Sequence, residues 1–175
     1  MKINNKDKNI VLIGFMGSGK TSVGKRLSLV LKREFIDTDD FIEKREGMTI
    51  NEIFKEKGEE EFRKIERELY KRFSTPKKKI IATGGGVIKN PANIANLKKG
   101  GVIVYLKSSP EKIAQNLKFD NTRPILQVDD KEAKIRELLA QREPFYNKYA
   151  EITIDVSNYD IDRTVDKIIE LAKVW

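Results

Sequence analysis

The sequence contains neither cysteine nor histidine among its 175 residues. Without cysteine the chain can form neither disulfide bonds nor thiolate metal sites, which suits a reducing compartment, and we expect a cytoplasmic protein. Without histidine, a general base must be a carboxylate or a lysine. The polar start of the chain has no apolar signal region behind it, and apolar runs such as residues 10–13 have the length of a strand. We therefore expect no secretion and no membrane insertion.

The charge balance is basic, with 35 Lys and Arg against 27 Asp and Glu. A basic protein can bind nucleic acid, but it can equally bind small anions. Many lysines here are interleaved with acids on expected helices, and the only sharp basic run, residues 77–79, comes with no aromatic platform or nucleic-acid-binding motif. We expect small-molecule substrates rather than a nucleic-acid partner, and a monomer.

Strand-like and helix-like segments alternate along the chain. The expected strands are 10–13, 34–37, 79–82, 102–106 and 152–155. Helices are expected after Lys20, over about 39–74 with breaks near Gly47 and Gly58, from Pro91 to Gly100, from Pro110, over 129–149, and over 161–172. Residues 118–128 lack periodicity and read as a loop. The pattern predicts one α/β domain over 1–175, with a parallel sheet covered on both faces.

The segment from Gly14 to Thr21 matches the pattern G-x-x-x-x-G-K-[ST], and it lies between an expected strand and an expected helix. Glycines in this loop let successive backbone N–H groups point into one concavity at a helix N-terminus, which favours phosphate. We expect Lys20 to reach the β- and γ-phosphates of ATP, and Thr21 to face Mg²⁺. The predicted ATP-binding residues are Gly17, Ser18, Gly19, Lys20 and Thr21. The alternative is a glycine-rich turn that binds nothing.

Acidic residues follow the second expected strand, in Asp37-Thr38-Asp39-Asp40, whereas the third and fourth strands end without one. In an extended segment the carboxylates of Asp37 and Asp39 would share a side. We expect Asp37 to help hold Mg²⁺ through its water shell, and Asp39 to orient or deprotonate an acceptor hydroxyl. The alternative is that Asp39 or Asp40 only caps the following helix.

Several further motifs occur in order along nearly the whole chain, and together they resemble those of the shikimate kinases. They are GFMGSGKT at 14–21, FIDTD at 35–39, GEEEFRKIE at 58–66, ATGGG at 82–86, TRPIL at 122–126 and REPFY at 142–146. The resemblance implies a three-layer P-loop kinase fold of the nucleoside-monophosphate-kinase type, with a five-stranded parallel sheet and a lid loop. It also implies Mg²⁺-dependent transfer of the ATP γ-phosphate to the 3-hydroxyl of shikimate, a step toward chorismate.

By the same resemblance, six residues would hold shikimate: Asp39, Arg63, Gly84, Gly85, Gly86 and Arg142. Lys20, Asp39 and Arg123 would be catalytic, with Arg123 also binding ATP from the lid at about 118–128, and Glu66 would steady Arg63. Guanidinium groups suit a carboxylated acceptor because they can bind a carboxylate with two parallel hydrogen bonds. Taken singly, Arg63 could instead form a surface ion pair with Glu59, and the glycines could be a flexible turn.

The resemblance also points to two places for adenine contacts. Relatives carry an arginine early in the lid, where this chain has Lys118, and residues 157–159 correspond to a second adenine-contacting loop. Other functions stay open at this point. They are a small-molecule P-loop kinase acting on gluconate or a nucleoside monophosphate, and a nucleotide-binding module without catalysis.

Overall fold

The structure is a computed structural model that describes residues 5–174, so the domain predicted over 1–175 extends beyond the described residues at both ends. Five strands form one sheet in the order β2-β3-β1-β4-β5, and every neighbouring pair is parallel. The strands are β1 (Asn9–Ile13), β2 (Phe35–Asp37), β3 (Ile80–Ala82), β4 (Gly101–Lys107) and β5 (Ile152–Asp155). The predicted five-stranded parallel sheet is confirmed.

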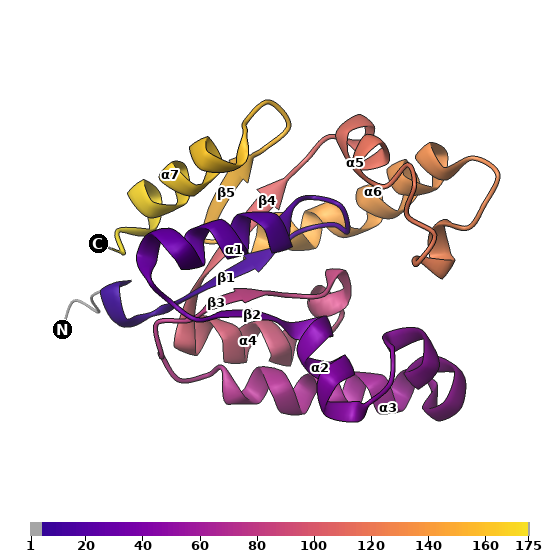
Figure 1. Ribbon diagram of the computed structural model, residues 1–175, viewed down its shortest axis with the longest axis horizontal. Coiled ribbons are helices and arrows are strands. Elements are labelled where there is room, and N and C mark those ends of the chain that lie inside the picture. Colours follow the sequence, from indigo (N-terminus) through magenta and orange to yellow (C-terminus); the bar gives the residue numbers. More distant parts are fainter. Residues whose placement is uncertain (1–4, 175) are drawn as a thin grey trace.

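Helices cover both faces of the sheet (Figure 1). They are α1 (Lys20–Leu31), α2 (Thr38–Glu46), α3 (Ile50–Arg72), α4 (Pro91–Gly100), α5 (Pro110–Asn116), α6 (Lys131–Tyr149) and α7 (Ile161–Ala172). Three short 3₁₀ helices complete the order: η1 (Asn5–Asp7), η2 (Gly85–Lys89) and η3 (Pro124–Leu126). No helix within residues 5–174 is long and apolar enough to cross a bilayer.

The core consists of two layers because successive side chains of each strand point to opposite faces of the sheet. Ile10 and Leu12 of β1 pack with apolar side chains of α1 and α7, whereas Val11 and Ile13 pack with those of α3, α4 and α6. All five residues of β1 are buried. This burial on both faces explains why β1 reads as a continuous apolar run, as β3 and β4 do, whereas the edge strand β5 alternates with exposed polar residues.

Glycines interrupt the helical stretch at 39–74 where the sequence predicted. Gly47 ends α2 in the left-handed conformation with φ 66°, which glycine adopts without a steric penalty. Gly58 lies inside α3 with φ 85° and ψ 164°, so α3 is two helical segments joined at a kink. The kink sets the direction of the second segment, which carries Arg63.

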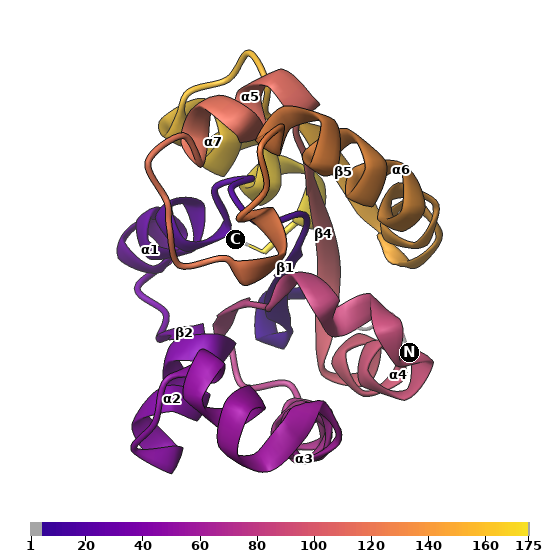
Figure 2. The ribbon, with the colours of Figure 1, turned by 90° about the vertical axis from the view of Figure 1, so that its right-hand side faces the viewer.

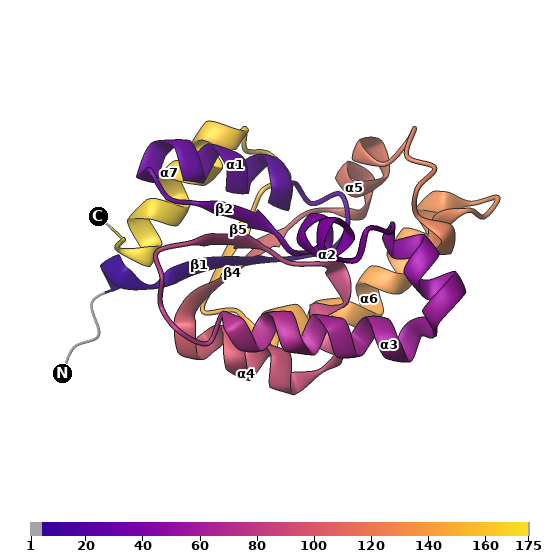
Figure 3. The same ribbon diagram turned by 60° about the horizontal axis from the view of Figure 1, so that its bottom comes forward.

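The loop predicted at 118–128 joins α5 to α6 and contains only the short helix η3. Figure 2 views the protein from the side where the strands end and shows this loop crossing in front of the segment that follows β1. Lys131 Nζ donates to the carbonyls of Leu117 (2.8 Å) and Asp120 (3.0 Å), and buried Leu126 anchors the far side of the loop. The same loop lies beside the start of α3 (Figure 3). There the Asn51 side-chain amide donates to the Thr122 carbonyl at 3.4 Å.

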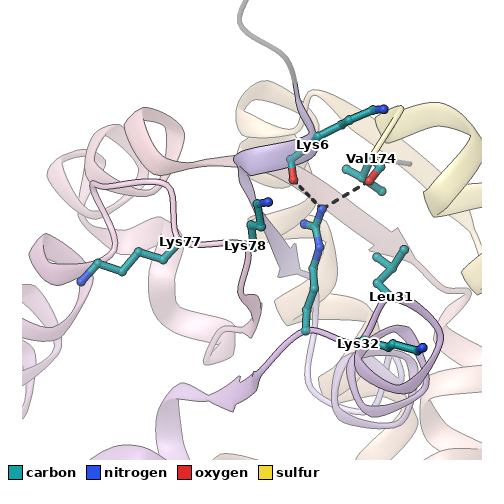
Figure 4. Close-up of a pocket in the computed structure, with 7 residues that line it drawn as sticks. Lys6, Leu31, Lys32, Lys77, Lys78 and Val174 are labelled. Carbon is teal, nitrogen blue, oxygen red and sulfur yellow. Dashed lines mark hydrogen bonds between the residues drawn. The ribbon is translucent and has the colours of Figure 1, made fainter.

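A basic hollow of about 450 Å³ lies at the opposite end of the sheet, where the strands begin. Its central guanidinium, that of Arg33, donates to the carbonyls of Lys6, Lys8 and Val174 at 2.8, 2.9 and 3.3 Å. In Figure 4 the side chains of Lys6 and Lys32 extend to the right at separate heights and that of Lys77 extends to the left, so the hollow does not gather these three ammonium groups at one point. The hydrogen bonds of Arg33 therefore connect the first residues of the described chain to its last.

Candidate active site

The glycine-rich loop follows β1 and leads into α1, as the sequence predicted. Gly17 and Gly19 have φ of 76° and 92°, which favour glycine. Gly17 also needs the space, because a Cβ there would lie 2.7 Å from the Leu117 side chain. The loop thus packs directly against the end of α5, where the lid begins.

Lys20 is the first residue of α1, and its side chain folds back over the loop. Its Nζ donates to the carbonyls of Gly14 (2.6 Å) and Phe15 (3.0 Å). The pKa of Lys20 is lowered to about 8, mainly by burial and next by the positive charge of Arg123, while the carboxylates of Asp39 and Asp37 oppose the shift. The Lys20 ammonium group is therefore held beside the loop by two neutral carbonyls. An anionic ligand bound in the loop would attract it away from them.

Asp37 connects the loop to the second strand. Its Oδ2 accepts a hydrogen bond from the Thr21 hydroxyl at 2.9 Å, and its Oδ1 accepts from the backbone N–H groups of Asp39 and Asp40 at 3.0 and 3.1 Å. Asp37 is thus the N-cap of α2. The prediction that the segment from Asp37 to Asp39 is extended was wrong beyond Asp37, because α2 begins at Thr38, and neither Asp39 nor Asp40 is the cap. Asp39 comes near Asp37 because it lies in the first turn of α2.

The neighbouring oxygens of Thr21 and Asp37 suit Mg²⁺ by their chemistry. Mg²⁺ prefers hard oxygen ligands and keeps several waters, so one or two protein groups together with phosphates are enough. No group of three or more metal-ligating side chains occurs within residues 5–174, which argues against an all-protein metal cage in that part of the chain.

The glycine triplet lies at the carboxyl end of β3, against three predicted acceptor-binding side chains. A Cβ on Gly84 would lie 2.9 Å from Asp39 Oδ1, one on Gly85 would lie 3.4 Å from Arg142 Nη1, and one on Gly86 would lie 2.9 Å from Arg63 Nη1. Gly84 and Gly86 therefore allow the close approach of Asp39 and Arg63, because any larger residue at 84 or 86 would displace a charged group, whereas a methyl group at 85 would only touch Arg142. The structure brings together all six residues predicted to hold the acceptor.

Arg63 makes both of the contacts that the sequence suggested. Its Nη1 donates to Oε1 of buried Glu66 at 2.5 Å, and its Nη2 lies 3.5 Å from Oε1 of exposed Glu59. Its guanidinium also lies over the Phe62 ring, 5.2 Å from the centroid. Arg63 is thus held in place from one side by a buried carboxylate while it faces the glycine triplet on another.

Two buried hydroxyls that the sequence did not single out support the triplet. The Gly84 N–H donates to Thr38 Oγ1 at 3.1 Å, and the Tyr70 hydroxyl lies 3.4 Å from the same oxygen. Burial, and next the charge of Glu66, raises the pKa of Tyr70 well above its usual value, so the hydroxyl stays neutral. Tyr70 follows Glu66 by four residues on the buried face of α3, but only the packing of α3 against α2 shows that its hydroxyl lies beside Thr38.

The charges of Asp39 and Arg123 act on each other. Burial is the main cause that raises the pKa of Asp39, and the nearby charge of Asp37 raises it further, while Lys20 and Arg123 oppose the shift. Arg123 lies on the lid, with its Nε 3.5 Å from Asp120 Oδ2. The lid arginine is therefore close enough to both Lys20 and Asp39 to act on their charges.

A groove of about 1200 Å³ extends from the glycine-rich loop between α1, α5 and the start of α7. Lys112 and Asn116 of α5 line it together with Tyr159. The Asn116 amide also donates to the Gly17 carbonyl at 2.8 Å. Lys118, expected here by resemblance, does not line the groove, and its Nζ lies 5.5 Å from the centroid of the Phe119 ring. The sequence did not single out Lys112 and Asn116, because whether they line the groove depends on where α5 packs.

Comparison with known proteins agrees with this geometry. The family model described as shikimate kinase matches residues 16–173. A shikimate kinase of Caldanaerobacter subterraneus subsp. tengcongensis is 51% identical over 162 residues, covering 93% of this chain and 94% of the relative. One of Thermoanaerobacter pseudethanolicus is 47% identical, covering 93% and 95%. The chain belongs to the shikimate kinase family.

Solved structures show the same relationship. A shikimate kinase from Acinetobacter baumannii in complex with shikimate superimposes with a TM-score of 0.89 at 39% identity, covering 97% of this chain and 95% of that one. A gluconokinase from Sinorhizobium meliloti reaches a TM-score of only 0.54 at 15% identity and shares the fold alone. The three-layer P-loop kinase fold is confirmed. Within that fold the chain resembles the shikimate kinase much more closely than it resembles the gluconokinase.

We expect Thr38→Val to destabilise the protein by about 1–3 kcal/mol, because it keeps the shape of the side chain but leaves the Gly84 N–H without its acceptor. Thr38→Ser is the matched control, since it keeps the hydroxyl. Urea denaturation followed by circular dichroism measures both free energies of unfolding. A Thr38→Val variant as stable as the unmodified protein would show that this hydrogen bond contributes nothing, while any loss in Thr38→Ser measures the buried methyl group alone.

Proposed function

We propose that the protein transfers the γ-phosphoryl group of ATP to the 3-hydroxyl of shikimate, giving shikimate 3-phosphate and ADP on the route to chorismate and aromatic amino acids. The observation that carries this proposal is the glycine triplet packed against Asp39, Arg142 and Arg63 beside the phosphate loop. It combines a site for a small carboxylated polyol with a site for the phosphates of a nucleotide.

The acceptor side follows from the charges and the space. Shikimate carries one carboxylate and three hydroxyls, so Arg63 and Arg142 anchor the carboxylate, and Asp39 accepts a hydrogen bond from the reacting hydroxyl. The triplet of Gly84, Gly85 and Gly86 lets the ring approach the backbone. A nucleoside monophosphate as acceptor has no carboxylate, so it would leave the pairing of Arg63 and Arg142 at this site unexplained.

The donor side uses the loop from Gly14 to Thr21. Backbone N–H groups of Gly17, Ser18 and Gly19 bind the phosphates, and Lys20 moves from the loop carbonyls to the β- and γ-oxygens. The groove lined by Lys112, Asn116 and Tyr159 takes the adenosine. Thr21 and Asp37 would hold Mg²⁺, which neutralises phosphate charge when it is bound.

In the transfer step, the 3-oxygen of shikimate forms a bond to the γ-phosphorus as the bond to the bridging oxygen of ADP breaks. Asp39 orients the hydroxyl, and its raised pKa makes it a better proton acceptor than an exposed aspartate. Lys20 and Arg123 stabilise the charge on the phosphoryl oxygens. The lid excludes water, which would otherwise compete as acceptor.

The proposal includes the remaining expectations from the sequence: a monomer in the cytoplasm with no nucleic-acid partner. These expectations stay predictions. The groups that a non-catalytic nucleotide-binding module could lose, among them Lys20, Asp39 and Arg123, are all present and lie near enough to act on one another's charges, which supports catalysis.

A coupled assay of ADP release with Mg²⁺-ATP tests the function. Shikimate is expected to give turnover well above the acceptor-free rate, whereas gluconate and AMP are not, because neither matches both the carboxylate anchors and the ring space. Turnover with gluconate or AMP but not with shikimate would replace the proposed acceptor. No acceptor-dependent ADP release would favour the non-catalytic module.

Nucleotide binding is expected to take up a proton near and above pH 8. Free Lys20 has a pKa of about 8, and bound phosphates favour its ammonium form. Affinity for ADP therefore falls as the pH rises above about 8, and proton uptake is larger at about pH 8.5 than at about pH 7. Calorimetry in buffers of different ionisation enthalpy measures the uptake. In Lys20→Arg, which stays charged, the pH-dependent uptake should vanish; its persistence would assign the proton to another group.

Arg123→Ala is expected to lower turnover at least about 100-fold, because it removes a cation that stabilises charge developing on the transferred group. Asn121→Ala, an exposed change in the same lid, is the control and should leave turnover nearly unchanged. Steady-state kinetics and a thermal melt measure activity and folding. A well-folded Arg123→Ala variant with near-normal turnover would rule out this role.

A further inference from the structure

Glu59 and Lys89 lie at the edge of the acceptor site, and no step of the proposed reaction uses them. Glu59 is the first residue after the kink at Gly58, and Lys89 is the last residue of η2, directly beyond the glycine triplet. Both side chains are exposed, at 58% for Glu59 and 51% for Lys89. They are therefore free to change partners without disturbing the core.

A single carboxylate oxygen connects these residues to the site. Oε1 of Glu59 lies 3.5 Å from Arg63 Nη2 and 3.8 Å from Lys89 Nζ. The other partner of Arg63, Glu66, is only 2% exposed and holds Nη1 at 2.5 Å. Arg63 thus has one tight, buried carboxylate partner and one loose, exposed one.

The loose contact lies on the guanidinium group that the acceptor's carboxylate needs. Glu66 takes one N–H of Nη1 and Glu59 lies against Nη2. A carboxylate that binds the guanidinium through both Nη atoms therefore meets Glu59 at Nη2. Lys89 lies in the same electrostatic field: burial lowers its pKa first, and then the charges of Arg63 and Arg142 lower it further. When the Glu59 carboxylate leaves Arg63, it can therefore keep Lys89 as its partner.

We propose that Glu59 competes with the acceptor's carboxylate for Arg63, and that Lys89 relieves this competition by drawing Glu59 away. In the free protein, Glu59 occupies the Nη2 side of Arg63 in place of the substrate. When the acceptor binds, the Glu59 carboxylate pairs with Lys89 and leaves Nη2 to the substrate. The pair adjusts acceptor affinity without touching the reacting atoms, and the inference rests on the proposed function for the identity of the acceptor.

A double-mutant cycle tests the proposal, with Glu59→Gln, Lys89→Met and the double variant assayed for acceptor KM, ATP KM and kcat. Exposed ion pairs of this kind change affinities by about two- to five-fold. Glu59→Gln is expected to lower the acceptor KM by that factor, and Lys89→Met to raise it. In the double variant the effect of Lys89→Met should disappear, because no carboxylate remains to be drawn away. ATP KM and kcat should change little.

Glu60→Gln is the matched control, because it removes the same charge from the neighbouring exposed position of α3. It should leave the acceptor KM nearly unchanged, which separates a local competition from a general change in charge. Thermal melts check that all variants fold.

Three results would overturn the proposal. A higher acceptor KM in Glu59→Gln would mean that Glu59 orients Arg63. A Lys89→Met effect of equal size with and without Glu59 would mean that Lys89 binds the acceptor itself. Unchanged KM values throughout would mean that the contacts do not matter for binding.

The acceptor assay on the unmodified protein separates this inference from the proposed function. If shikimate is phosphorylated and the acceptor KM is the same in all variants of the cycle, only the inference fails. If another carboxylated acceptor is used instead, the cycle is measured with that acceptor. If no carboxylated acceptor is used, both the function and the inference fail.

Discussion

The constraint on which the rest of the site depends is the close approach of three charged side chains to the backbone at the end of β3. Asp39, Arg142 and Arg63 each come so near to one of three consecutive glycines that a methyl group would touch or displace them. They come from α2, α6 and α3, so three helices converge on one short segment. The sheet makes this possible because the carboxyl ends of parallel strands meet at one edge, where β1 also presents the phosphate loop.

Such crowding of charge has an electrostatic cost, which the structure limits by pairing and by hydrogen bonds. Burial shifts the pKa of Lys20 down and that of Asp39 up, and each of these groups partly offsets the shift of the other. Glu66 neutralises Arg63 from the buried side. The site is therefore arranged to gain favourable interactions when an anion enters, as the phosphates of a nucleotide would, and a preorganised arrangement of this kind stabilises charge in a transition state.

The two halves of the site are connected by a few polar contacts between distant segments. Asp37 accepts from Thr21 of the loop while it caps the helix that carries Asp39. Asn116 at the end of α5 donates to Gly17 of the phosphate loop, and Asn51 at the start of α3 donates to Thr122 of the loop at 118–128. The loop at 118–128 thus lies between the phosphate loop and α3, which carries Arg63.

The sequence by itself determined the five strands, the helix breaks at Gly47 and Gly58, the phosphate loop and the family. These depend on local periodicity, on glycine conformation and on motif spacing, which neighbouring residues specify. Only the tertiary structure decided the strand order, the N-cap role of Asp37, the support of Gly84 by Thr38 and Tyr70, and the groove residues Lys112 and Asn116. It also placed Glu59 between Arg63 and Lys89. Most of these contacts join residues far apart in the chain, so their partners are set by how helices pack on the sheet, which no local pattern encodes.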